Sequence, residues 1–474
     1  MSADPSRAPD VSPSPDTPPA PKATAQRSPD SQRAVIRQLA TLSWPIIGLN
    51  LMNVLALAVD TAFCGRLPDA TTALTALGYS TQLLFLLLVG MMGLTVGTVA
   101  VVARAHGAKD RERVDHALQQ GAQLSVLLGL LAAVVGNLIA APFVRVLGGS
   151  EPVVECATAY LRPMLLATAL PYLNILLGAV LRGVGNTRLA FQIALLINGL
   201  NALFNYVLVL GRFGAPSLGV EGAAYGTILA YAIGVAAMVI ALRSGREPAL
   251  TLHLRPVPLD RPMVGQLLRI GWPAAADMVL VNAAFLSIVG MLGSIDQIAV
   301  AAHGVGLRVQ ALAFVPGMAI AQATAALTGQ ALGARTPERV RLVARAGVLL
   351  CLSVMSVLAL ILFAFDAHIL AIFEIDPAGP LGQYALMWMH ELGAAMPVAG
   401  VHTALVGVLQ GAGATMVPLR INILATTLQV PASWLLGIWM GWGPFGVWMA
   451  FPLSFLLRTA LSARAVARHK WGGS

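Results

Sequence analysis

Long apolar runs separated by short polar segments are the main pattern along the chain. Between residues 40 and 466 these runs are about 20 to 30 residues long, and most Lys and Arg side chains lie between them. A helix needs about 20 predominantly apolar residues to cross a bilayer, so each run predicts one membrane span. The twelve predicted spans are 40–63, 77–102, 117–145, 157–181, 189–211, 220–243, 265–292, 300–331, 341–365, 383–409, 417–440 and 445–466.

The second half of the chain repeats the first at a distance of about 228 residues. Trp44-Pro45 returns as Trp272-Pro273, and the Leu-Arg-Gly-Val-Gly-Asn-Thr run that begins at Leu181 returns as Leu-Gln-Gly-Ala-Gly-Ala-Thr. Each half holds six spans, an even number, so both halves enter the membrane from the same side. The sequence therefore predicts an all-α membrane protein with twelve transmembrane helices in two six-helix lobes, related by a parallel pseudo-twofold repeat.

Composition agrees with a chain that is almost entirely embedded in a bilayer. Hydrophobic residues make up 57% of the chain and charged residues only 11%, whereas a soluble domain has about 25% charged residues. The net charge of +9 does not indicate a nucleic-acid partner, because the basic residues lie in short loops between apolar runs. Composition therefore predicts bilayer lipid as the surroundings of the chain, which we expect to be monomeric.

The chemistry-bearing residues exclude several classes of protein. Cys64, Cys156 and Cys351 are an odd number of cysteines without ligand spacing, so they predict neither a disulfide framework nor a metal site. The sequence has no Gly-x-x-x-x-Gly-Lys-Ser/Thr motif, so ATP hydrolysis within this chain is not expected to drive it. Without a nucleophile–base set, we expect no enzymatic activity and no cofactor.

Charge asymmetry between the loops predicts the orientation. Basic residues concentrate after spans 2, 4, 6, 8 and 10, whereas the opposite loops hold little beyond Arg66, Arg145, Arg162 and Arg212. The positive-inside rule then places both termini in the cytoplasm. Residues 1–33 are rich in Pro, Ser and Ala and predict a disordered cytoplasmic tail. The remaining division is an N-lobe at 34–243, a cytoplasmic linker at 244–264, and a C-lobe at 265–474 with a short basic tail.

Several short motifs, in order along the chain, resemble the multidrug and toxic compound extrusion (MATE) family. They are Trp44-Pro45 followed by Val59-Asp60-Thr61, Gly-Ala-Lys/Arg after spans 2 and 8, the Leu181 run, Ala301-Ala302-His303, and Gly329-Gln330-Ala331-Leu332-Gly333-Ala334. The resemblance covers residues 35 to about 466. It implies two lobes arranged as a V, a cavity that opens alternately to each side, and Na⁺ or H⁺ influx that drives export of bulky, often cationic compounds. It also implies the bacterial inner membrane as the location.

Asp60 is the strongest candidate for ion coupling. It is the one acidic residue of its apolar span, without a Lys or Arg there to neutralise it, and a charge inside a membrane costs at least a few kcal/mol. A low-dielectric cavity favours the protonated carboxyl, which can then exchange a proton near neutral pH. The resemblance implies the same role, since Asp60 lies fifteen residues after Pro45, as the family's coupling carboxylate does. The alternative is a buried aspartate that caps a broken helix.

Span 5 offers the expected neighbours of Asp60. Asn198, Asn201 and Asn205 follow at intervals of three and four residues, which places three amides on one helical face. The resemblance carries the family's ion site over to Asn201, Asn205 and Thr227, with Asn205 where some archaeal members have a second aspartate. A site with one negative charge favours H⁺ over Na⁺. Asn198 is expected to line the substrate cavity together with Asn53 and Asn174; interhelical amide hydrogen bonds are the alternative.

The second half lacks the carboxylates that several branches of the family carry. Val281 and Ala399 stand where a glutamate and an aspartate would be expected, which resembles the DinF-like branch, where coupling rests on the N-lobe. Asp277 in span 7 and Arg308 in span 8 remain, and opposite charges on adjacent membrane helices usually pair. We predict an Asp277–Arg308 pair, either structural or opened during transport. Other polar candidates in this half, His303, His402 and Glu391, are more typical of hydrogen-bonded core residues.

Pro45 interrupts the hydrogen bonding of its span, so it predicts either a hinge that bends with the state of Asp60 or a static kink. Two other functions compete with an exporter. A related lipid or polysaccharide flippase would line its cavity with several cationic residues, whereas Arg308 is the one mid-span basic residue that we recognise. A membrane enzyme acting on lipid would need clustered His, Asp or Ser at a membrane face, and we find none. The pattern favours a cation-coupled antiporter.

Overall fold

The computed structural model describes residues 31–253, 255–469 and 471, and almost all of them are helical. The helices are α1 Gln32–Cys64, α2 Ala70–Gly107, α3 Arg111–Val146, α4 Glu151–Leu166, α5 Ala169–Val184, α6 Thr187–Leu208, α7 Gly219–Arg243, α8 Arg261–Ile295, α9 Gln297–Gly333, α10 Pro337–Ala364, α11 Asp366–Ile372, α12 Pro380–Gly411, α13 Met416–Trp434, the π-helical turn η1 Leu435–Trp439, and α14 Gly443–Arg468. The predicted tail, residues 1–33, lies outside the described residues except for 31–33, at the beginning of α1.

The prediction of twelve spans is confirmed. In the described part of the chain, eleven helices are long and apolar enough to cross a membrane, and α4 and α5 together form the twelfth span. Every predicted span lies within one of these helices apart from a few residues at its ends and the bend in span 4. Most helices extend beyond the predicted boundaries, because polar and basic residues continue the helix outside the apolar run.

Span 4 is broken rather than continuous. Its two halves, α4 and α5, meet at a bend of 55° around Ala167 and Thr168. Pro171 has no backbone N–H and cannot bond to the carbonyl of Ala167. The Thr168 hydroxyl donates to the carbonyl of Leu165 at 2.8 Å, which satisfies one of the acceptors freed at the break. The local sequence therefore explains the bend, although the apolar pattern alone does not indicate it.

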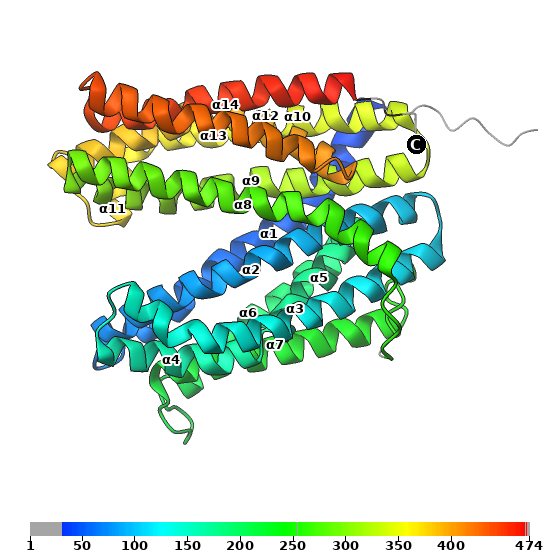
Figure 1. Ribbon diagram of the computed structural model, residues 1–474, viewed down its shortest axis with the longest axis horizontal. Coiled ribbons are helices and arrows are strands. Elements are labelled where there is room, and N and C mark those ends of the chain that lie inside the picture. The colour runs from blue at the N-terminus through cyan, green and yellow to red at the C-terminus, as the bar shows by residue number, and fades with distance from the viewer. Residues whose placement is uncertain (1–30, 254, 470, 472–474) are drawn as a thin grey trace, which may run out of the picture.

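The helices form two bundles, α1–α7 and α8–α14, which diverge from the end where they meet (Figure 1). The first half of each bundle's leading helix packs against the opposite bundle. Val35, Leu39 and Ile46 of α1 are buried against α9 and α10, and the beginning of α8 packs against α2. The two lobes thus contact each other through equivalent parts of the repeat.

Glycines allow the lobes to approach backbone to backbone. A Cβ at Gly97 in α2 would lie 2.1 Å from the carbonyl oxygen of Leu267 in α8, and one at Gly107 would lie 2.0 Å from that of Gln330 in α9. Gly333 faces the carbonyl of Arg104 in the same manner, at 1.8 Å. No residue with a side chain fits at these positions without moving a helix, so glycine sets the distance between the lobes here.

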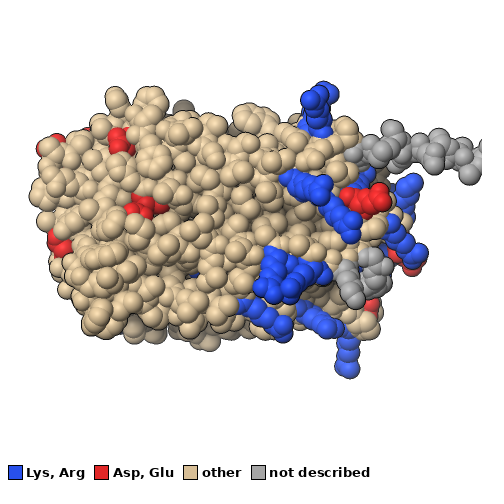
Figure 2. All heavy atoms as spheres, turned by 90° about the horizontal axis from the view of Figure 1, so that it is seen from above, with Lys and Arg blue, Asp and Glu red and all other residues tan. Residues whose placement is uncertain are grey.

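These contacts lie in the half of the molecule that carries most of the basic residues. We call the surface of this half the basic end and define it by Arg104, Lys109, Arg243, Arg339 and Arg464. These residues lie near helix termini or in the loop after α2, on every second connection along the chain. Figure 2 shows the Lys and Arg side chains gathered at one end of the visible face, while the opposite end of that face carries acidic residues and no basic ones. The loops after even-numbered spans therefore share one end, as the charge pattern predicts.

The segment that joins the lobes is held against α3. Amides of Gln119, Gln120 and Gln123 donate to the carbonyls of Arg255, Pro258 and Val257 at 2.9–3.3 Å. The carboxylate of Asp115 accepts from the Thr251 backbone N–H at 2.7 Å. The predicted linker at 244–264 overlaps α8 by its last four residues, because α8 begins at Arg261. The connection is thus attached to the N-lobe, and α8 departs from a fixed point.

Candidate functional site

Asp60 is not at the middle of α1; neighbouring helices of the N-lobe bury it. It lies one turn before the end of α1, away from the basic end, and its side chain is 8% exposed. Cys64, one turn further on the same face, is fully buried in the N-lobe core. The 60/64 face of α1 therefore points into the N-lobe, where α6 and α7 separate the carboxylate from solvent.

The nearest polar partner of Asp60 comes from α6. Asn205 Nδ2 donates to Asp60 Oδ1 at 2.6 Å, and Asn205 itself is fully buried. One turn earlier, Asn201 Nδ2 donates to Thr227 Oγ1 on α7 at 2.9 Å, and Asn201 Oδ1 lies 3.5 Å from Asn205 Nδ2. Three helices thus contribute one carboxylate, two amides and one hydroxyl. The predicted ion-coupling residues Asp60, Asn201, Asn205 and Thr227 are brought together.

One acceptor of this network has no partner. Asn205 Oδ1 is buried and accepts no hydrogen bond, and an unsatisfied buried acceptor is costly. The amide orientation is assigned from the hydrogen-bond network, and its rotation exchanges donor and acceptor. Facing a charged Asp60, the amide donates; after rotation it would accept from a protonated carboxyl or face a cation. The pair can therefore satisfy both states of the carboxyl.

Gly226 on α7 gives the Asn205 side chain its room. A Cβ at position 226 would lie 2.7 Å from Asn205 Oδ1 and 3.2 Å from Phe204 Cβ. A Cβ at Gly222, one turn earlier, would lie 2.6 Å from the carbonyl oxygen of Leu208. Sequence reasoning missed this role, although two glycines spaced by four residues on a membrane helix indicate close helix packing.

The other predicted N-lobe residues lie outside this network. Asn198 donates to the carbonyl of Ala194 on its own helix at 2.8 Å. Asn53 is exposed on α1, and Asn174 is half-buried on α5 with an unpartnered Oδ1. Their place in a substrate cavity stays a prediction. Pro45 is buried within α1, which continues as a single helix through it, and its role as a hinge also stays a prediction.

The predicted Asp277–Arg308 pair is wrong. Asp277 Oδ1 accepts from Asn422 Nδ2 on α13 at 2.7 Å. Arg308 is exposed on α9, and the described side chains include no acid within ion-pair distance of it. Adjacent spans do not bring these two side chains together, because Asp277 faces α13 and Arg308 is exposed.

A different arginine completes the C-lobe network. Arg458 on α14 is 7% exposed, and its Nη1 donates to Asn422 Oδ1 at 3.3 Å. Its other nitrogens donate to Thr426 Oγ1, Gln429 Oε1 and Ser454 Oγ at 3.0–3.1 Å. The sequence signal was present, since Arg458 lies near the middle of the predicted span 445–466, where a charged residue is rare, but sequence reasoning missed it.

The weaker candidates of the C-lobe are core residues. His303 is 1% exposed, lies 4.9 Å from the Trp388 ring centroid, and has no hydrogen-bond partner on either ring nitrogen. His402 Nδ1 lies 3.1 Å from Ser462 Oγ. Neither histidine hydrogen-bonds to Asp277 or Asp60 in the described structure, although His402 lies against Arg458 on α14.

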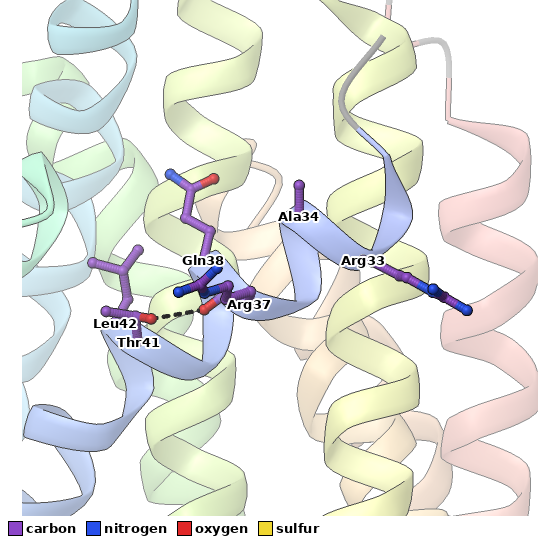
Figure 3. Close-up of a pocket in the computed structure, with 6 residues that line it drawn as sticks. All are labelled: Arg33, Ala34, Arg37, Gln38, Thr41 and Leu42. Atoms are coloured by element: carbon purple, nitrogen blue, oxygen red, sulfur yellow. Dashed lines mark hydrogen bonds between the residues drawn. The ribbon is translucent and has the colours of Figure 1, made fainter.

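Open grooves occur at the basic end among the described residues. One groove of about 530 Å³ is lined by the first turns of α1, where the Thr41 hydroxyl donates to the Arg37 carbonyl at 2.8 Å (Figure 3). A groove of about 610 Å³ at the start of α8 and α13 includes Gln266 and Arg269. Asp60 is eighteen residues beyond the first groove, about 27 Å along the helix. These grooves are therefore separate from the Asp60 network.

Comparisons with known proteins agree on one family. The family model described as MatE matches residues 45–207 and again residues 273–435, two segments that are 228 residues apart. The chain is 25% identical to the Probable multidrug resistance protein YoeA of Bacillus subtilis, over 91% of this chain and 93% of that protein. It is 29% identical to the Probable multidrug resistance protein NorM of Rhizobium meliloti, over 87% and 89% of the two chains.

Solved structures show the same fold. One, described as the outward-facing conformation of a multidrug resistance MATE family transporter of the MOP superfamily, matches with a TM-score of 0.83 at 21% identity, over 91% of this chain and 96% of that one. A second, a MOP superfamily transporter from Pyrococcus furiosus whose description reports reverse polarity of its binding pocket, matches with a TM-score of 0.82 at 21% identity, over the same shares. The two-lobe arrangement is therefore common to this chain and these transporters.

Proposed function

The chain belongs to the MATE family of membrane transporters, which are not enzymes, and on this premise we propose that it is a cation-coupled antiporter. It exports bulky, often cationic organic compounds by alternating access, with Asp60 as the coupling carboxylate and H⁺ as the coupling ion. The names of the relatives from Bacillus subtilis and Rhizobium meliloti support drug export. We further propose the bacterial inner membrane as its location, with the basic end in the cytoplasm.

The hydrogen bond between Asp60 and Asn205 carries this proposal. It joins α1 to α6 across 2.6 Å with a buried amide as donor. A charged carboxylate can only accept hydrogen bonds, whereas a protonated one also donates, and the unpartnered Asn205 Oδ1 would accept that bond after the amide rotates. Proton binding therefore changes which contacts hold α1 to α6. A change of contact at one end of α1 can alter how its other half packs on the C-lobe.

The composition of the network favours H⁺ over Na⁺. It contains one carboxylate, two amide oxygens and the Thr227 hydroxyl. A proton needs only the carboxylate, whereas Na⁺, a hard cation, needs several oxygen ligands. Here Thr227 accepts from Asn201 and Asp60 accepts from Asn205. Binding Na⁺ would require both of these hydrogen bonds to be rearranged, whereas a proton changes only the contact between Asp60 and Asn205.

The conformation supports alternating access. The close glycine contacts between the lobes lie toward the basic end, and Asp60 lies near the opposite end of α1. With the basic end in the cytoplasm, the lobes are closed on the cytoplasmic side and the carboxylate is close to the outer side. This arrangement suits uptake of a proton from outside, before the lobes separate at the basic end and close at the other.

Transport in proteoliposomes tests the proposal. Efflux of ethidium, a fluorescent organic cation, is measured with a pH gradient alone and with a Na⁺ gradient alone. We expect the pH gradient to drive efflux and Asp60→Asn to abolish it. The matched control is Asn137→Ala on α3, which removes an amide that donates to the Ala133 carbonyl of its own helix and keeps transport. Efflux that requires Na⁺ and ignores a protonophore, or an active Asp60→Asn variant, would show the assignment to be wrong.

A further inference from the structure

The C-lobe contains a second buried polar centre, built around an arginine. The Arg458 guanidinium donates to Thr426 Oγ1 at 3.0 Å and to Gln429 Oε1 at 3.1 Å. A buried guanidinium costs several kcal/mol in lost hydration unless it is hydrogen-bonded and neutralised. Four side-chain oxygens supply the hydrogen bonds. The negative charge that neutralises the guanidinium is not among these four partners; it belongs to a side chain that one of them contacts.

Asn422 connects the arginine to a carboxylate. Its Oδ1 accepts from Arg458 at 3.3 Å, while its Nδ2 donates to Asp277 Oδ1 at 2.7 Å. Asp277 is half-buried on α8, with Asn422 placed between the two charges. Of the titratable groups beside α14, His402 lies against Arg458 and its Nδ1 is 3.1 Å from Ser462 Oγ, whereas His303 and Tyr384 pack on Trp448. The centre therefore contains one carboxylate and one permanent cation, with a net charge of zero.

The repeat shows that this centre uses the same three helices as the Asp60 network. Helices α8, α13 and α14 are the repeats of α1, α6 and α7. Asp277 and Asn422 stand where the N-lobe has Leu49 and Ala194, about 228 positions earlier. Conversely, the counterpart of Asp60 is Ile288, which is 3% exposed in the C-lobe core. Each lobe thus has one polar centre, and the two centres lie at different depths.

The counterpart of Arg458 in the N-lobe has no room for a side chain. A Cβ added at Gly222 would lie 2.6 Å from the Leu208 carbonyl oxygen, and one added at Gly446 would lie 2.6 Å from that of Leu436. This equivalence aligns α7 with α14 and Gly234 with Arg458. A Cβ at Gly234 would lie 2.3 Å from Ile197 Cγ1. In the C-lobe the counterpart of Ile197 is alanine. The arginine is therefore a specific feature of the C-lobe, accommodated by a smaller neighbour.

We propose that Arg458 is a tethered cation that occupies the C-lobe polar centre and neutralises Asp277, so that the C-lobe binds no coupling ion. Ion coupling then rests on Asp60, and one cation enters per transport cycle. A second cation near Asp277 would be repelled by the guanidinium in a low-dielectric surrounding. This inference rests on the proposed coupling role of Asp60, but the occupancy of the C-lobe centre is tested without transport.

Cation counting on purified protein is the first test. Arg458→Met removes the guanidinium and keeps an unbranched apolar side chain. We expect this variant to bind one more cation than the wild type, as a proton taken up from a weakly buffered solution with an indicator dye or as ²²Na⁺. The double variant Asp277→Asn,Arg458→Met should return to the wild-type number. A folded Arg458→Met protein that binds no additional cation would overturn the inference.

The coupling ratio of the wild type provides a second test, which does not depend on how the single variant folds. In proteoliposomes, the pH gradient at which ethidium flux reverses gives the number of protons per ethidium. We expect one proton for the wild type and for the double variant, because neither has a free C-lobe carboxylate. A ratio of two in the wild type would overturn the inference while leaving coupling at Asp60 intact. Loss of all coupled flux would instead contradict the proposed function.

Discussion

Replacing Gly226 with alanine tests whether the Asp60–Asn205 contact carries coupling. A Cβ at position 226 would lie 2.7 Å from Asn205 Oδ1, so the amide has to move away from the position in which it donates to Asp60 at 2.6 Å. A hydrogen bond to a charged group contributes about 1.5–3 kcal/mol. Each 1.4 kcal/mol corresponds to about a tenfold change in an equilibrium constant. We expect coupled efflux to fall by roughly tenfold to a hundredfold.

The fold should survive this change. Overpacking a close contact costs about 1–3 kcal/mol, and alanine returns about 1 kcal/mol through its higher helix propensity. The matched control is Gly199→Ala on α6, where an added Cβ meets nothing within 4 Å. The assay is the initial rate of ethidium efflux in proteoliposomes under an imposed pH gradient. Equal rates for the two variants, at equal amounts of folded protein, would refute the role assigned to the Asn205 amide.

Three further substitutions give distinct expected results. Asn205→Asp adds a second carboxylate beside Asp60, which is expected to raise Na⁺ affinity in ²²Na⁺ binding; unchanged affinity would contradict the ion-selectivity argument. Gly97→Ala places a Cβ 2.1 Å from the Leu267 carbonyl oxygen and is expected to open the basic end, so cysteines introduced there should be labelled faster. Gly90→Ala, where an added Cβ meets nothing within 4 Å, should leave the labelling rate unchanged. Arg308→Ala removes an exposed side chain that has no ion-pair partner among the described residues and should change the free energy of unfolding by less than about 0.5 kcal/mol; a larger loss would indicate a partner for Arg308.

Much of the site was predictable from the sequence because its residues lie at fixed helical offsets. Asn201 and Asn205 are four residues apart, so they must share a face of any helix that contains them. Asp60 is a single charge in an apolar span, and such residues usually face the interior of the bundle. The family resemblance then indicated which helix faces which. The structure adds that Asp60 is protected by α6 and α7, because it lies only one turn from the end of α1.

The C-lobe shows where this reasoning fails. Adjacency of spans suggested that Asp277 pairs with Arg308, but pairing depends on how each helix is rotated about its axis. That rotation is decided by packing against several neighbours at once, and it places Asp277 opposite Asn422 instead. Arg458, which Asn422 links to Asp277, is 181 positions from Asp277 in the sequence. A contact of this kind has no local periodicity that could indicate it.

By itself, the sequence determined the number of spans, the parallel repeat and the basic end, since each depends on local chemistry: apolar length, recurring motifs and loop charge. Only the tertiary structure decided the bend between α4 and α5, the glycine contacts that bring Gly97 and Gly107 against the other lobe, and the partners of Asp277. These features depend on distances between helices and on their rotation. Both arise from the packing of all the helices together, which no single segment of the chain encodes.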